Sequence, residues 1–261
     1  MKSCGTTPNP PLIGRRLSVI SLFSLLAGLL ILFGCAASSP APPVMESYEG
    51  AVESLKSGDE AERLEAIIYL GASKNPAAIP EIAALLSDED VWIRLETTLA
   101  LRNFQSPLTI EYLRKALGDE SAEVRFSAAS ALFELDDYSG EEALVEGLLS
   151  PRDDFRYQAL MFLGRMRSRK ALPGMIKLLP DPQPRLRATA AYLLGLYRER
   201  SAIPGLLVAM RDNVAYVRKD SWEALRAIAG RDYEFHWDGD EDLRNREQAV
   251  WQEWWEEEEK E

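Results

Sequence analysis

The chain has few of the side chains on which metal and redox chemistry depend. Its 261 residues include two cysteines, Cys4 and Cys35, and one histidine, His236. Zinc sites draw on several cysteine or histidine ligands, and disulfide frameworks need several cysteine pairs, so neither fits this composition. The sequence also contains no glycine-rich phosphate loop after a strand and no Gly-x-Ser-x-Gly turn. We therefore expect no cofactor, no bound metal and no catalytic residues.

Positive charge is in deficit as well. The chain has 30 lysines and arginines against 42 aspartates and glutamates, a formal net charge of −12. An acidic surface repels phosphate, which argues against nucleic acid and anionic lipid headgroups as ligands. We expect the partner to be another protein, for which a basic surface is the natural complement.

Strands have little support, because alternating polar and β-branched residues are missing over any useful length. What recurs instead, every 31 residues, is arginine: Arg63, Arg94, Arg125, Arg156, Arg187 and Arg218. Three residues after each comes a small side chain: Ala66, Thr97, Ala128, Ala159, Ala190 and Ser221. Seven residues after each comes a leucine: Leu70, Leu101, Leu132, Leu163, Leu194 and Leu225. Offsets of three and seven share one face of an α-helix, so each repeat is predicted to open with a helix that buries this stripe.

A second apolar register occupies the other half of each repeat. Its first members are Ile82, Leu113, Leu144, Met175 and Leu206. Four residues later come Leu86, Leu117, Leu148, Leu179 and Met210. An offset of four again marks one helical face, and turn-forming residues separate the two registers. The sequence therefore predicts an all-α fold, an α-solenoid of about six 31-residue helix pairs.

These segments resemble a known repeat family. Asp119 to Leu132, Asp212 to Leu225 and Ala202 to Leu207 resemble HEAT repeats of the bacterial phycobilisome-lyase-like type, and the resemblance covers roughly residues 44 to 230. It implies stacked helix pairs. For function it implies either a protein-binding scaffold or a bilin lyase-like maturation factor, since a fold does not name an activity.

The periodic arginines share a face with core residues and so need partners, because an unpaired buried charge costs several kcal/mol. Six residues before four of them stand aspartates: Asp88, Asp119, Asp181 and Asp212. We expect an Asp/Arg ladder that keeps neighbouring repeats in register, with each aspartate also capping the following helix. Ser57 and Ser150 interrupt the pattern, and Asp59, Asp153 or Asp154 could substitute locally. A row of anion-binding arginines is the alternative.

The first residues differ in composition from the rest. Lys2, Arg15 and Arg16 precede an apolar run from Leu17 to Phe33, which ends at Gly34 and Cys35. This order predicts a lipoprotein-type signal peptide at residues 1–34, lipidation of Cys35, and a flexible proline-rich tether at residues 35–46. The protein would then be exported and membrane-anchored, at the outer membrane where a cell has two. A retained transmembrane anchor is the alternative.

The repeat period ends near Gly230, so we place the solenoid at residues 47–230 and a C-terminal segment at residues 231–261. Trp251, Trp254 and Trp255 fall on one helical side. They predict a capping helix followed by an acidic tail, or alternatively an aromatic hot spot for a partner. His236 is interpreted as a loop residue. Asp238, Asp240 and Asp242 lack the later ligands of a calcium loop.

We expect a non-catalytic, envelope-anchored scaffold that mediates protein–protein interaction. Polar residues of the second helices are candidate contacts for the partner: Glu111, Arg114, Lys115, Glu142, Glu146 and Lys177. The alternative function is that of a bilin lyase-like or other maturation factor.

Overall fold

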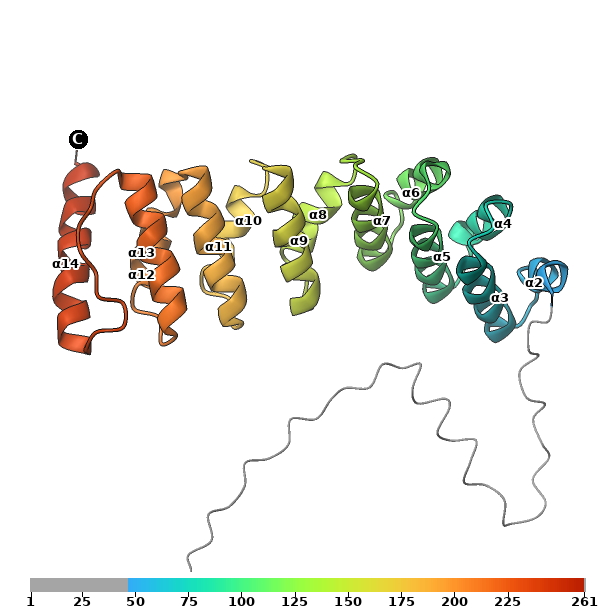
Figure 1. Cartoon of the computed structure of the whole chain (residues 1–261), viewed down its shortest axis with the longest axis horizontal. Coiled ribbons are helices and arrows are strands. Elements are labelled where there is room, and N and C mark those ends of the chain that lie inside the picture. The colour runs from blue at the N-terminus through green and yellow to red at the C-terminus, as the bar shows by residue number, and fades with distance from the viewer. Residues whose placement is uncertain (1–46, 261) are drawn as a thin grey trace, which may run out of the picture. The chain divides into compact units, whose positions relative to one another are not determined.

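The computed structural model describes residues 47–260, in which every regular element is a helix (Figure 1). Long and short helices alternate along the chain. The long helices are α3 (Glu60–Ser73), α5 (Val91–Asn103), α7 (Ala122–Glu134), α9 (Asp153–Met166), α11 (Pro184–Tyr197) and α13 (Ala215–Ala229). The short helices are α2 (Tyr48–Ser54), α4 (Ala78–Ala83), α6 (Ile110–Ala116), α8 (Glu141–Gly147), α10 (Leu172–Lys177) and α12 (Ile203–Ala209). Three 3-10 turns extend them, η2 (Ala84–Ser87), η3 (Pro107–Thr109) and η4 (Arg200–Ala202), and α14 (Glu241–Glu258) ends the chain. The predicted all-α solenoid is confirmed.

The long helices form where the sequence stripe predicts them. The leucines seven residues after each periodic arginine are all fully buried, and so are the small residues three after it. Local signals set the ends: Asp59 and Asp90 cap α3 and α5 through their side chains, whereas Lys74, Arg167, Arg198 and Gly230 end helices in the left-handed conformation. Burial of the stripe against neighbouring helices supplies most of the stability of such helices.

The array begins half a repeat earlier than the arginine period indicates. Ala51 and Leu55, at the start of the described chain, are 0% and 4% exposed and pack against α3. They precede Ile82 and Leu86 by 31 residues, so α2 is a short helix of the same register. The structural pairs are therefore α2 with α3 through α12 with α13, each a short helix followed by a long one.

The last helix pair is covered by a different element. After α13 the chain runs through residues 231–240 without regular structure and then forms α14, which packs on α12. Trp251 is fully buried and Trp254 is 6% exposed, with their ring centroids 5.8 Å apart in an edge-on contact. Tyr233 packs edge-on against Trp251, and Trp222 Nε1 donates to the Tyr233 carbonyl at 3.0 Å. This geometry is that of a cap, because Trp251 and Trp254 are turned inward; Trp255 is half-buried.

The signal peptide, the tether and Cys35 lie outside the described residues. Between residues 47 and 260, no helix combines the length and the apolar character needed to cross a bilayer.

Candidate functional site: the arginine ladder and the exposed face of the long helices

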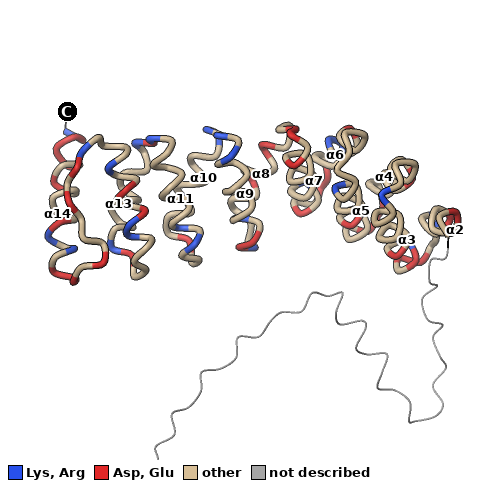
Figure 2. Tube along the Cα trace, in the orientation of Figure 1, with Lys and Arg blue, Asp and Glu red and all other residues tan. Residues whose placement is uncertain are grey.

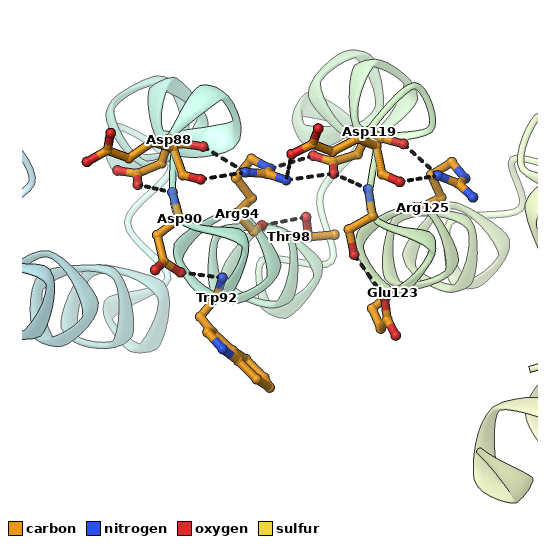
Figure 3. Close-up of polar contacts among 11 residues, drawn as sticks. Asp88, Asp90, Trp92, Arg94, Thr98, Asp119, Glu123 and Arg125 are labelled. Carbon is orange, nitrogen blue, oxygen red and sulfur yellow. Dashed lines mark hydrogen bonds and ion pairs between the residues drawn. The ribbon is translucent and has the colours of Figure 1, made fainter. Parts of the chain in front are cut away.

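Each rung of the ladder joins two repeats through one guanidinium. Arg94 Nε and Nη2 donate to the two carboxylate oxygens of Asp119 at 2.8 and 3.1 Å. Arg94 Nη1 donates to the carbonyl oxygens of Asp88 at 2.9 Å and Glu89 at 3.2 Å (Figure 3). The side chains of Arg94 and Asp119 are each 7% exposed. The fork geometry of arginine matches a carboxylate, so the pair is both strong and directional.

The aspartate of each rung lies 25 residues after its arginine, in the next repeat. The same bidentate pairing joins Arg156 to Asp181 and Arg187 to Asp212, and Arg63 Nε lies 3.0 Å from Asp88 Oδ2. The expected pairing with the carboxylate six residues before the arginine is wrong. That position contributes its backbone carbonyl instead, which is why Ser57 and Ser150 serve Arg63 and Arg156 as well as an aspartate would. Asp59 instead caps α3, and Asp154 pairs with Arg152.

The ladder aspartates also fix the turn before each long helix, though not by capping it. The Oδ1 atoms of Asp88, Asp119, Asp181 and Asp212 accept the N–H of the residue two positions on, at 2.8 to 2.9 Å. That residue is the N-cap position of the next long helix. Burial opposes the charge of Asp119, but hydrogen bonds from Arg94 and from the Ser121 N–H outweigh it and lower the pKa of Asp119.

Two arginines depart from the pattern. Residue 150 is a serine, so Arg125 pairs with Glu146, whose side chain is 51% exposed. Residue 243 is a leucine, so Arg218 Nε donates to the Trp237 carbonyl at 2.6 Å. The structure contradicts the alternative of an anion-binding row of arginines. Five of the six periodic arginines already bind a carboxylate of the same chain.

The polar residues predicted to contact a partner are exposed on the short helices, but most already have partners. Arg114 pairs with Asp137 at 2.5 Å, and Glu142 accepts from Lys170 Nζ at 2.6 Å. Lys115 lies over the ring of Tyr112, and Glu146 is bound to Arg125. Glu111 and Lys177 are exposed and, within residues 47–260, make no ion pair.

The C-terminal loop is tied to α14 by the single histidine. The ring nitrogen Nδ1 of His236 lies 2.6 Å from Glu247 Oε1. The backbone N–H of His236 donates to Glu247 Oε2, also at 2.6 Å. The hydrogen bond between the imidazole ring and the Glu247 carboxylate raises the pKa of His236. Asp240 accepts the Leu243 N–H as the N-cap of α14. In the described part of the chain no three metal-ligating side chains converge.

Sequence reasoning missed the outward face of the long helices. Two residues after each periodic arginine stands a side chain that can accept a hydrogen bond: Glu65, Glu96, Ser127, Gln158, Thr189 and Asp220. An offset of two places it about 200° around the helix from the arginine. We call these six residues the acceptor row; Ser127 is its one buried member, 8% exposed. The acceptor row follows the same 31-residue period, but it lies on the side of the helix opposite the core, so the apolar pattern does not reveal it.

Three carboxylates of the acceptor row are unpaired. Within the residues described, Glu65, Glu96 and Asp220 make no ion pair or side-chain hydrogen bond, and all three are half-buried. Burial raises the pKa of Glu96 and of Asp220. Large apolar side chains lie exposed on the same face: Ile68, Trp92, Met161, Tyr192, Leu196 and Tyr216. Carboxyl-bearing residues recur from α2 to α14, with basic residues interspersed (Figure 2).

The chain is similar to several solved structures, and two of them, with TM-scores of 0.50 or more, support the helical repeat architecture. The Escherichia coli protein YibA aligns with a TM-score of 0.55 and 17% identity over 69% of this chain and 70% of that one. A designed armadillo repeat protein in complex with the peptide (KR)4 aligns with a TM-score of 0.50 and 19% identity, over 68% and 98% of the two chains. The CpcE–CpcF complex of phycocyanin lyase from Nostoc aligns with a TM-score of 0.47 and 23% identity, over 76% and 82%.

A search of curated proteins found no match. The family model described as HEAT repeats matches residues 48–133 and 141–226, the greater part of the chain. The predicted resemblance to HEAT repeats is thereby confirmed, and the chain belongs to the HEAT-repeat family.

Proposed function

We propose that the protein is a non-catalytic scaffold that binds an extended, basic segment of another protein across the exposed face of its long helices. The observation that carries this proposal is the acceptor row with its unpaired carboxylates Glu65, Glu96 and Asp220. HEAT-repeat arrays are suited to protein interaction, because stacked repeats present one continuous surface.

Charge supports a basic partner. The net charge of −12 favours encounter with cations, and within residues 47–260 the half-buried carboxylates Glu65, Glu96 and Asp220 form no ion pair. Burial disfavours the charged form of the Glu96 carboxylate. A lysine or arginine of the partner beside Glu96 would stabilise that charged form. The partner's other side chains can pack on Trp92, Met161 and Tyr192, since aromatic and methionine side chains are favoured at interfaces.

Spacing supports an extended segment. Neighbouring packed helices lie about 8–10 Å apart, and an extended chain advances about 3.3 Å per residue. A strand laid across the long helices would therefore advance about three residues per helix. Because successive side chains of a strand point to opposite faces, a basic residue at every position keeps one close to each helix of the acceptor row. The designed armadillo protein that binds (KR)4 gives an example of a basic peptide on a similar fold.

The proposal also includes attachment of the protein to the cell envelope. The basic start, the apolar run and the Gly34–Cys35 boundary support lipidation of Cys35, and a retained anchor would also hold the scaffold at a membrane. Metabolic labelling with a fatty-acid analogue should mark the wild type and not Cys35→Ser. Labelled bands of equal strength would contradict lipidation at this residue.

A binding experiment tests the proposed face. We expect a fluorescent peptide in which lysine and arginine alternate to bind the full chain, and Glu96→Lys to weaken that binding about tenfold without changing the melting temperature. The matched control is Glu111→Lys, which makes the same charge change on a short helix and should leave affinity unchanged. Loss of affinity in Glu111→Lys but not in Glu96→Lys would move the site to the short helices. Covalent attachment of a bilin to a pigment protein by the purified chain would contradict a non-catalytic role.

A further inference from the structure

Small residues set the distance between two pairs of neighbouring long helices. Gly71 lies against Ala100, where an added Cβ would come within 2.9 Å of the alanine Cβ, and Gly195 lies against Ala224 in the same way. These contacts join α3 to α5 and α11 to α13, which pack closely along their lengths, as do α5 and α7. Close backbone approach on this scale requires small side chains at the contact.

The junction between α7 and α9 breaks this rule. The two positions that hold Gly71 and Ala100 in the first interface hold Phe133 and Phe162 here. Their ring centroids lie 4.6 Å apart, and the rings of Phe126 and Phe155 stack at 4.5 Å. The rings keep the two backbones apart, so α7 and α9 do not make the close approach seen between α3 and α5, α5 and α7, and α11 and α13; α9 and α11 are intermediate. Side-chain contacts of this kind adapt to rotation more readily than interlocked backbones.

The ladder is interrupted at the same junction. Ser150 occupies the place of a ladder aspartate: its Oγ accepts the Arg152 N–H at 3.2 Å, as Asp119 Oδ1 accepts the Ser121 N–H. Ser150 has no carboxylate for Arg125, so Arg125 pairs with the exposed Glu146 instead. An exposed ion pair of this kind holds position weakly compared with a buried bidentate one.

The hydrophobic core divides here too. One large cluster of buried side chains ends at Leu132, and the other begins at Phe126, so the division runs through α7. Contact persists on the short-helix side, where Gly147 lets α8 approach Phe126 and Ala159. Figure 1 shows α8 between the two long helices.

We infer that the α7–α9 junction is an articulation between two rigid half-arrays, α2–α7 and α9–α14, which turn about α8. Turning there changes the spacing between the exposed faces of α7 and α9 while leaving the spacing within each half fixed. The inference rests on packing and the missing rung, independently of what the protein binds.

Hydrogen exchange followed by mass spectrometry on the full chain tests this inference. We expect two blocks of amides, α2–α7 and α9–α14, that exchange at different rates, with the amides of α8 exchanging at least about tenfold faster than those of α6 and α12. Ser150→Asp should supply the missing rung to Arg125 and slow exchange in α8 about tenfold. The matched control is Ser57→Asp, which adds the same charge at the same repeat position but has Leu32, not arginine, 25 residues earlier.

The inference is overturned if wild-type exchange shows no boundary at α7, a result that needs no variant. It is also overturned if Ser150→Asp slows α8 no more than Ser57→Asp does.

Discussion

At the scale of single residues, the buried ladder pairs should dominate the effects of charge substitutions. Asp119→Asn leaves the buried guanidinium of Arg94 with only the exposed Glu120 as a carboxylate partner, and we expect it to lower the free energy of unfolding by about 3–5 kcal/mol. Glu120→Gln is the control, because Glu120 also pairs with Arg94 at 3.0 Å but is 86% exposed and should cost below about 1 kcal/mol. Urea unfolding of the three chains at pH 7 measures both values, and equal costs would count against a buried rung.

The same pair predicts a pH dependence. Because the folded-state pKa of Asp119 is lowered, its stabilisation is present above the ordinary carboxyl pKa of about 4 and is lost as the pH falls through the folded value. The difference in unfolding free energy between wild type and Asp119→Asn should therefore narrow as the pH falls from 7 to about 3. A difference that widens on acidification would show that the carboxylate is not held charged by Arg94.

The sequence predicted that arginine and aspartate form a ladder but not which aspartate each arginine binds. Each ladder aspartate lies six residues before one arginine and 25 after another, so the 31-residue period is consistent with either partner. The choice depends on the direction in which the guanidinium leaves the long helix. Helix geometry in three dimensions decides that, and spacing along the chain does not.

At the scale of helices, glycine controls how closely two long helices approach. Gly195→Ala would place its Cβ 2.7 Å from the Ala224 Cα, and we expect a loss of about 1–3 kcal/mol from overpacking even though alanine is the better helix former. Gly58→Ala, where nothing lies within 4 Å of the added Cβ, should be neutral. Thermal unfolding of both variants checks this, and a stabilised Gly195→Ala would show that the helices have room to spare.

Periodicity predicted the long helices well, because their buried stripe is repeated in each unit. It missed α2, although Ala51 and Leu55 continue the second register, because the repeat count was started at Arg63. It also missed the acceptor row. Solvated and partner-binding helix faces have the same composition, and only the structure shows that Glu96 and Asp220 are half-buried without a partner.

At the scale of the whole molecule, α14 should determine whether the end of the array stays folded. Trp251→Ala removes a fully buried side chain between the last repeats and the cap, and we expect it to cost about 3–5 kcal/mol. Trp255→Ala, at a half-buried position on the same helix, should cost clearly less. Tryptophan fluorescence during urea unfolding follows the change. Equal effects would argue that α14 does not cap the array.

The central claim is that four of the six periodic arginines, Arg63, Arg94, Arg156 and Arg187, join consecutive repeats through the aspartate 25 residues later. A double-mutant cycle in urea between Arg94→Gln and Asp119→Asn tests it directly, with a second cycle between Arg94→Gln and Asp88→Asn for comparison. We predict a coupling free energy of about 1–3 kcal/mol for the first pair and near zero for the second, since Asp88 serves Arg94 through its backbone carbonyl. A coupling that vanishes for Asp119, or is larger for Asp88, would contradict the account.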